Sequence, residues 1–330
     1  MKKETKKLHS GYTTGAHASF AFHSALDLFL ATNKHTLSKT NKMDNDDLDV
    51  TKGCEIIVSI SNNLSDLKLN SITHKPYILE SKNSKCFVYA GEGVGVVTKD
   101  GLKPPKGYPA INPTPLESFR DIFLKTVSKK IEFFCCVSVS DGEVLALQTA
   151  NAKVGVLGGI SILGTRGIVK PISADAYLDS IKEELNFAYT NAYESIHFTL
   201  GNSSYQKALK SASEVSSSPN SAYIIEIGNF IFDGISLAVS KKFKNIVLWI
   251  GVAKSVKIAQ GCKNTHNRFG SIDFKDVGSW IDKDLEDCIT IKGLRESLGD
   301  DVYEFDKIVL KKTKEQLYRW FDKKIEVIIC

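Results

Sequence analysis

The arrangement of hydrophobic and polar residues changes in character partway along the chain. In the first part, short apolar runs typical of strands are mixed irregularly with patterns of helical spacing. We expect strands at residues 55–60, 86–90 and 131–139, and helices at 16–31, 115–128 and 174–187. Because these helices and strands do not alternate regularly, they predict an α+β domain, which we place at residues 1–188.

A polar stretch at residues 32–53 interrupts this first pattern. Four acidic residues are crowded in it, namely Asp44, Asp46, Asp47 and Asp49. We interpret the stretch as a surface loop in preference to a metal site.

Beyond residue 190 the pattern becomes regular. Three apolar runs each end at a glycine and precede a helical pattern, at 196–200 before Gly201, 223–227 before Gly228 and 246–250 before Gly251. A fourth run at 326–329 follows a long amphipathic helix at 303–322. The repeated strand–glycine–helix unit predicts a Rossmann-like α/β domain at residues 189–330, with a small, mainly parallel sheet. Its three glycine loops would share one edge, where open α/β sheets bind ligands.

Composition narrows the class of protein. The chain has 330 residues, 42% hydrophobic and 25% charged, which fits a soluble protein of two domains. The net charge of +5 is not gathered into arginine-rich stripes with aromatics, so we expect no nucleic-acid partner. No apolar run is long enough to span a bilayer, and the amino terminus has no apolar leader segment. The seven cysteines show no metal-binding spacing, which favours a reducing cytoplasm and no protein-bound metal.

The segment 158–173 is the strongest candidate for a binding loop. Four glycines interrupt its apolar run, and Ser161, Thr165 and Arg166 stand between them. Backbone N–H groups exposed in such a turn can bind a carboxylate or a phosphate. The alternative is a tight turn between buried strands. If the loop binds a ligand, Gly159→Val should abolish binding and leave the circular dichroism spectrum near native.

A second candidate lies where the first predicted helix begins. Thr13, Thr14 and Gly15 present two hydroxyls and backbone N–H groups at that point. Ordinary helix capping and an anion site use the same geometry, so both readings stay open.

These motifs resemble those of a known family, the cobalt-precorrin-5B C1-methyltransferases (CbiD) of anaerobic cobalamin biosynthesis. The resemblance runs from about residue 8 to 270, and the motifs follow one another in the same order as in the family. It is carried by the segments 11–15 (GYTTG), 91–99 (GEGVGVVTK), 109–113 (PAINP), 155–169 (GVLGGISILGTRGIV), 228–230 (GNF) and 264–266 (NTH). The resemblance implies a cytoplasmic enzyme built from an α+β and a Rossmann-like domain. It would use S-adenosylmethionine as methyl donor, and cobalt would enter only as part of the substrate.

The resemblance also suggests roles for single residues. His266 and Glu92 are the candidates for acid–base catalysis. Arg166 and Arg268, with Lys153 and Lys170, would pair with the carboxylates of an anionic tetrapyrrole. The candidates for substrate and donor binding are Thr13, Thr14, Gly15, Gly93, Gly158, Gly159, Ser161, Gly164, Thr165, Arg166, Gly228, Asn229, Thr265 and Arg268. A homo-oligomer and contacts with neighbouring pathway enzymes are compatible with this assignment.

The chain departs from the family pattern at two places. His17 stands where members usually carry a small residue or cysteine, and an acidic block before Gly91 is replaced by residues 76–86, in which Glu80 is the only acid. The second departure motivates an alternative, a corrinoid-binding protein with reduced or lost catalysis. A dinucleotide-dependent oxidoreductase is a further alternative, although no GxGxxG opens a helix after a strand.

Overall fold

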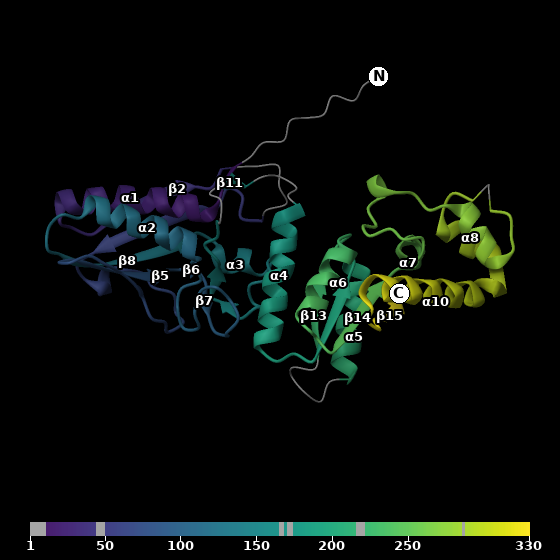
Figure 1. Ribbon diagram of the computed structural model, residues 1–330. Coiled ribbons are helices and arrows are strands. Elements are labelled where there is room, and N and C mark those ends of the chain that lie inside the picture. Colours follow the sequence, from purple (N-terminus) through teal and green to yellow (C-terminus); the bar gives the residue numbers. More distant parts are fainter. Residues whose placement is uncertain (1–10, 44–49, 165–167, 170–173, 216–221, 286–287) are drawn as a thin grey trace, which may run out of the picture. The chain divides into compact units, whose positions relative to one another are not determined.

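The computed structural model describes residues 11–43, 50–164, 168–169, 174–215, 222–285 and 288–330 (Figure 1). The chain is a mixed α/β protein with several sheets, and it divides into two compact units, Met1–Ala174 and Asp175–Cys330. The predicted domains, 1–188 and 189–330, meet near the end of helix α4 (Ala174–Thr190).

The first unit contains a five-stranded sheet, several short strands and three α-helices among its described residues. Its helices are α1 (Thr14–Thr32), η1 (Leu64–Asp66), α2 (Pro113–Thr126) and α3 (Gly142–Ala146). The sheet strands are β2 (Thr36–Asn41), β3 (Glu55–Ser61), β4 (Tyr77–Glu80), β5 (Lys85–Ala90) and β8 (Glu132–Val139). The short strands are β1 (Gly11–Tyr12), β6 (Gly93–Val94), β7 (Val96–Val97), β9 (Val156–Leu157), β10 (Gly159–Ile160) and β11 (Ile168–Val169).

The five-stranded sheet has the order β2-β3-β8-β5-β4, and only the β5–β8 pair is parallel. The predicted strands at 55–60, 86–90 and 131–139 are confirmed as β3, β5 and β8. The prediction that 32–53 is entirely loop is wrong, because all of β2 pairs with residues 55–60 of β3. Strand β2 lies at the edge of the sheet and half of its side chains face solvent, so it needs no apolar run to form. The four crowded acids lie outside the described residues.

Helices α1 and α2 cover one face of this sheet (Figure 1). Both were predicted, and α2 begins two residues earlier than expected because Pro113 supplies the fixed φ that suits a first helical position. The two helices meet through the stacked rings of Phe22 and Phe119, whose centroids are 4.7 Å apart. Phe29 of α1 packs against Phe133 of β8 at 5.1 Å, which joins the helical layer to the sheet.

The second unit is built on four parallel strands in the order β13-β12-β14-β15. They are β12 (Ser195–Thr199), β13 (Ala222–Glu226), β14 (Asn245–Ile250) and β15 (Glu326–Ile329). The helices besides α4 are α5 (Asn202–Val215), α6 (Ile231–Ser240), α7 (Val252–Ala259), η2 (Asn267–Phe269), α8 (Phe274–Ile281), α9 (Ile291–Leu298), η3 (Gly299–Asp301) and α10 (Val302–Phe321). All four strands were predicted from their apolar runs.

Helices cover both faces of this parallel sheet. Ala208 of α5 packs in one cluster with Ile224 of β13 and Val247 of β14. Phe187 of α4 instead contacts Tyr223, with ring centroids 5.6 Å apart. Because Tyr223 and Ile224 are consecutive in one strand, they point to opposite faces, and so α4 and α5 lie on opposite sides of the sheet.

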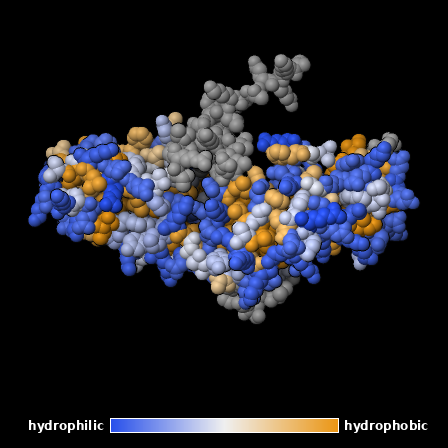
Figure 2. Space-filling model, in the orientation of Figure 1, coloured by the Kyte–Doolittle hydropathy of each residue, from blue (hydrophilic) through white to orange (hydrophobic). Residues whose placement is uncertain are grey.

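Helices α7 to α10 form a further apolar cluster that includes Val256, Phe305 and Val309. On the face of the molecule in Figure 2, hydrophobic groups lie in small patches between hydrophilic ones. Among the described residues, no helix is both long enough and apolar enough to cross a membrane.

Candidate functional site

Three glycine-rich segments that are far apart in the sequence come together in the first unit. Strand β6 of the Gly91 segment pairs in parallel with β10 of the Gly155 segment, with Gly93 opposite Gly159. Strand β7 of the Gly91 segment pairs with β9, also from the Gly155 segment. The Gly11 segment joins the same assembly, since the N–H of Gly15 donates to the carbonyl of Leu163 at 2.7 Å.

Glycine is required at the centre of this assembly because backbones approach closely there. A Cβ atom added to Gly159 would lie 2.2 Å from the carbonyl carbon and oxygen of Gly93. One added to Gly93 would lie 2.0 Å from the carbonyl oxygen of Val139, and one added to Gly142 would lie 2.1 Å from that of Gly93. Gly93 and Gly159 also have φ angles of +76° and +153°, which disfavour any side chain. The expectation that Gly159→Val would leave the fold near native is therefore wrong.

Two asparagines hold the strands around Gly158 and Gly159. The side-chain amide of buried Asn70 donates to the carbonyls of Val94 and Gly158, both at 2.8 Å, and its oxygen accepts from the N–H of Ile72. The amide of Asn151 donates to the carbonyl of Gly159 at 3.3 Å. Sequence reasoning missed both residues, because a single asparagine in a loop carries no distinctive pattern.

Ser161 is bound to the same assembly through Asn151. Its hydroxyl donates to the side-chain oxygen of Asn151 at 3.3 Å, and it is half-buried. Gly158 lies against Asn70, and Gly164 lies against Thr13, where a Cβ would be 2.2 Å from the threonine hydroxyl oxygen. Thr165 and Arg166 lie outside the described residues.

The threonine turn before α1 acts as a cap. The Thr13 hydroxyl accepts a hydrogen bond from the N–H of Ala16 at 3.2 Å, as an N-cap residue does. The Thr14 hydroxyl donates to the carbonyl of Leu163 and accepts from its N–H at 2.9 Å. Both hydroxyls thus make hydrogen bonds within the protein, and they join the start of α1 to the Gly155 segment.

A groove lies between α1 and α2 where both helices begin. Its cavity volume is about 340 Å³, and its lining includes Gly15, Ser19, Phe20, Pro115, Ser118 and Gly164. The Phe20 side chain is 62% exposed, and the ring of Tyr12, itself 42% exposed, lies edge-on to it at 6.3 Å. The groove therefore combines the positive ends of two helix dipoles with an accessible aromatic surface.

His17 is a buried structural residue. Its Nδ1 lies 3.0 Å from the Thr40 hydroxyl, and its Nε2 accepts from the N–H of Met43 at 3.2 Å. Burial, with a smaller effect of the nearby Lys42, lowers the pKa of His17 below its ordinary value. The ring links α1 to the edge strand β2 and to the residues after it, so His17 has a packing role in this chain.

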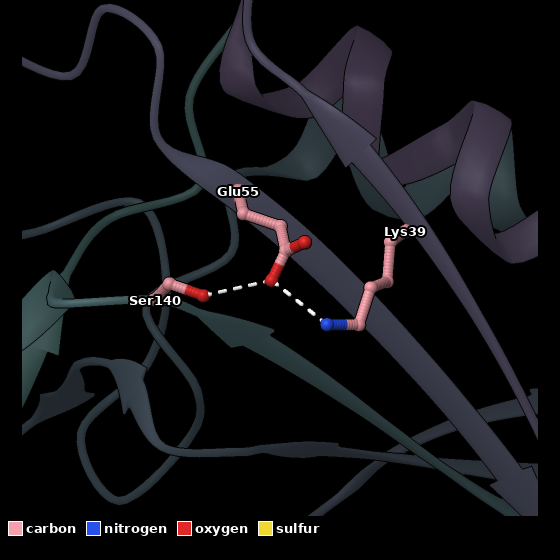
Figure 3. A network of polar contacts seen from close by, with 3 residues as sticks. All are labelled: Lys39, Glu55 and Ser140. Atoms are coloured by element: carbon pink, nitrogen blue, oxygen red, sulfur yellow. Dashed lines mark hydrogen bonds and ion pairs between the residues drawn. The ribbon is translucent and has the colours of Figure 1, made fainter.

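Two glutamates of this region differ in exposure and in the contacts of their side chains. Glu92 belongs to the Gly91 segment, and Glu55 begins β3. Glu92 is exposed, and its carbonyl accepts from the N–H of Val139 at 2.9 Å. The Glu55 carboxylate accepts from Lys39 Nζ and from the Ser140 hydroxyl, both at 3.0 Å (Figure 3). These two hydrogen bonds lower the pKa of Glu55, and the bond from Lys39 has the larger effect. The network ties β2 and β3 to the residue that follows β8.

Residues 76–86, where the resemblance led us to expect an acidic block, contain a β-hairpin turn. Strands β4 and β5 pair antiparallel, and the N–H of Ser81 donates to the carbonyl of Ser84 at 3.0 Å. Glu80, the only acid in the stretch, makes a surface ion pair with Lys85 at 3.0 Å.

The motif residues of the second unit form a cluster of their own. The hydroxyl of buried Thr265 donates to the side-chain oxygen of Asn229 at 3.0 Å. Buried Lys257 donates to the carbonyl of Thr265, to the side chain of Asn267 and to the carbonyl of Gly270, at 3.2, 2.7 and 3.0 Å. Sequence reasoning missed Lys257, which fixes the loop from 265 to 270.

This loop presents His266 and Arg268 to solvent. Nδ1 of His266 accepts from the N–H of Arg268 at 3.2 Å and caps helix η2. Because Nδ1 is an acceptor, the neutral ring carries its proton on Nε2 and can donate it in a hydrogen bond. The guanidinium of Arg268 lies over the ring of Phe269 at 4.7 Å. Gly228, at φ +54°, directly precedes Asn229 and lies next to the hydroxyl of Tyr177.

The described residues contain no group of three or more histidine, cysteine, aspartate or glutamate side chains placed to hold a metal ion. The seven cysteines are free thiols, and Cys54, Cys86, Cys135 and Cys136 are buried.

Comparison with known proteins identifies relatives along almost the whole chain. A family model described as CbiD matches residues 31–171. The cobalt-precorrin-5B C(1)-methyltransferase of Thermoanaerobacter sp. (strain X514) is 32% identical, over 96% of this chain and 91% of the relative. The protein of the same name from Methanocaldococcus jannaschii is 29% identical, over 98% and 94%. A crystal structure of cobalamin biosynthesis protein (cbiD) from Archaeoglobus fulgidus is 22% identical and covers 79% of this chain and 83% of that one, with a TM-score of 0.34.

Proposed function

Since this chain belongs to the CbiD family, we propose that it transfers a methyl group from S-adenosylmethionine to C1 of cobalt-precorrin-5B. The observation that carries the proposal is the match to relatives of that name over nearly their full length. In the reaction, C1 of the macrocycle supplies the electron pair to the methyl carbon, the carbon–sulfur bond breaks, and S-adenosylhomocysteine leaves. No side chain needs to act as a nucleophile, so the protein's main task is to position the two reactants.

The architecture of each unit supports this proposal. We infer that the first unit is the α+β domain of the family and that the second is its Rossmann-like domain, because the second unit has four parallel strands with helices on both faces. The assembly of Gly93, Gly158 and Gly159 then serves as a rigid support for the neighbouring exposed groups.

The groove between α1 and α2 is the proposed contact for the macrocycle. A corrinoid precursor is a broad, largely apolar ring with carboxylates at its rim. Phe20 and Tyr12 offer an aromatic surface for the ring, and the amino-terminal ends of α1 and α2 offer a favourable field for carboxylates. Arg268, exposed in the second unit, is a further candidate for pairing with a carboxylate.

Glu92 remains the candidate base in the first unit, because its carboxylate is exposed beside the glycine assembly. The geometry of His266 favours a hydrogen-bond donor over a base, since Nδ1 is already occupied by the N–H of Arg268. Acid–base catalysis by either residue would make only a modest contribution, because methyl transfer from a sulfonium develops no negative charge on the donor.

The proposal is tested by incubating the full chain with cobalt-precorrin-5B and S-adenosylmethionine labelled in its methyl group. We expect label in the corrinoid and an equal amount of S-adenosylhomocysteine. Phe20→Ala should weaken binding of the corrinoid about tenfold or more, since it removes an aromatic contact of about 1–3 kcal/mol. Leu28→Ala is the matched control, because Leu28 is also exposed on α1 and does not line the groove.

Two other outcomes would each contradict the proposal. Tight corrinoid binding with no label transferred would favour a binding protein, in line with the missing acidic block. Binding of NAD and no binding of S-adenosylmethionine would favour an oxidoreductase.

A further inference from the structure

The strand order of the second unit reverses at one point along the sheet. The chain passes from β12 to β13 on one side and then returns to place β14 on the other side of β12. The connections after β12 and β14 therefore diverge from each other. In open α/β sheets, ligands bind outside the carboxyl ends of the strands at such a reversal.

Two of the three glycines at this edge, Gly201 and Gly251, open onto free space. A Cβ atom added to Gly201, after β12, or to Gly251, after β14, would have no atom within 4 Å outside its chain neighbours. This differs from the first unit, where Gly93 and Gly159 lie against other backbone segments. Side-chain-free backbone next to open space can approach a ligand closely.

Two buried hydroxyls, one on β12 and one in the helix after β14, have no hydrogen-bond partner among the described residues. They are Thr199 Oγ1, on the last residue of β12, and Ser255 Oγ, in the helix that follows β14. A buried hydroxyl left without a partner costs about 1–3 kcal/mol, so each such group in a folded protein calls for an explanation. Lys254, next to Ser255, donates from Nζ to the carbonyl of Leu200 at 3.0 Å and so spans the two connections.

An acidic side chain stands at the end of the neighbouring strand. Glu226 is the last residue of β13, is exposed, and lies directly opposite Thr199 in the sheet register. Residues opposite each other in neighbouring strands point to the same face, so the carboxylate and the unpartnered hydroxyl share one face of the sheet. Glu226 is also within electrostatic reach of Lys254, because it opposes the lowering of the Lys254 pKa that burial causes.

Two aromatic residues lie next to Glu226 at this edge of the sheet. The hydroxyl of Tyr177 donates to the backbone carbonyl of Glu226 at 3.2 Å, and the Tyr177 ring lies 5.3 Å from the ring of Phe230. Gly228 lies between Glu226 and Phe230 in the sequence, and a Cβ added to it would lie 3.1 Å from the Tyr177 hydroxyl. The edge thus offers a carboxylate and half-exposed aromatic rings in one place.

We propose that this edge of the second unit binds the nucleoside part of the methyl donor, with the Glu226 carboxylate accepting hydrogen bonds from the ribose hydroxyls. The proposal rests on the proposed function, which supplies an adenosyl donor. A carboxylate at the end of the second strand is suited to a vicinal diol, because each of its oxygens accepts one hydroxyl in a charge-assisted bond. Tyr177 and Phe230 are then placed to contact the base.

The test compares ribose recognition in three forms of the full chain. S-adenosylhomocysteine and its 2′,3′-dideoxy analogue are titrated by calorimetry into the wild type, Glu226→Gln and Glu194→Gln. Glu194 is an exposed glutamate that directly precedes β12, at the opposite end of the same sheet. Glutamine has the shape of glutamate, and an unchanged unfolding temperature checks the fold of each variant.

We expect the wild type and Glu194→Gln to prefer the ligand with the ribose hydroxyls by about tenfold to a hundredfold, as charge-assisted hydrogen bonds predict. Glu226→Gln should lose most of that preference and bind the dideoxy analogue as the wild type does. Wild-type affinity and preference in Glu226→Gln would overturn this inference and leave the proposed function intact. Failure of the wild type to bind either adenosyl ligand, with cobalt-precorrin-5B present, would overturn both.

Discussion

The two units use glycine in motifs that look alike in sequence but serve different physical purposes. In the first unit, Gly93 and Gly159 lie so close that a Cβ on Gly159 would be 2.2 Å from the Gly93 carbonyl. In the second, Gly201 and Gly251 stand at strand ends with no atom within 4 Å of an added Cβ. Glycine permits close packing of backbone in one unit and leaves open space in the other.

Buried polar side chains also have different roles in the two units. Asn70 joins strands of the first unit's interior through the carbonyls of Val94 and Gly158. Lys257 of the second unit binds a loop whose other residues, His266 and Arg268, face solvent. The comparison indicates that the first unit's motifs mainly determine stability and that the second unit's motifs are available to a ligand.

The largest expected effect comes from Gly159→Ala. The added Cβ collides with backbone and the φ of +153° is unfavourable for alanine, so we expect a loss of about 2–6 kcal/mol in the free energy of unfolding of the first unit. Hydrogen exchange of the peptides covering β6 and β10 would measure this loss locally. Gly251→Ala is the control and should change the stability of the second unit by less than about 1 kcal/mol. Equal, small effects of the two substitutions would remove the distinction between the units.

A smaller loss is expected from Asn70→Ala. The change leaves the carbonyls of Val94 and Gly158 and the N–H of Ile72 without their partner, at a cost of about 2–4 kcal/mol. Urea unfolding followed by exchange of the β6 and β9 peptides would report it. Asn62→Ala, an asparagine exposed on the same unit, should have little effect. If Asn70→Ala shifted only ligand binding, Asn70 would belong to a functional site instead.

The smallest expected effect is a pH dependence due to His17. Its pKa is lower in the folded protein than the ordinary value of about 6.5, so below that pH the unfolded chain binds more protons than the folded one. The contribution of His17 to stability is therefore present above about pH 6.5 and is lost as the pH falls toward the folded-state pKa. Hydrogen exchange of α1 at several pH values would detect it, and His17→Gln should flatten the profile. His23→Gln, on the exposed face of α1, should leave the profile unchanged.

The spacing of apolar residues predicted most of the strands and helices, because the buried side chains of an element recur with the period of that element. The four strands of the second unit are continuous apolar runs, as buried parallel strands require, and each was found from its run, three of them with a glycine at the end. Strand β2 left no such trace, since an edge strand is held by backbone hydrogen bonds and can be polar. The candidate residues were found through the family motifs, and Asn70, Lys257 and Glu226 were missed because each is ordinary in its local sequence.

The sequence by itself determined the family, the alternation of strand and helix in the second half, and a helix start with a threonine cap at Thr13 or Thr14. These depend on neighbours in the chain, where periodicity and side-chain type act directly. Only the tertiary structure decided that Gly159 meets Gly93, that His17 links α1 to β2, and that Glu226 lies opposite Thr199. Each of these depends on residues far apart in the chain, and the strand register that brings them together is a property of the whole sheet.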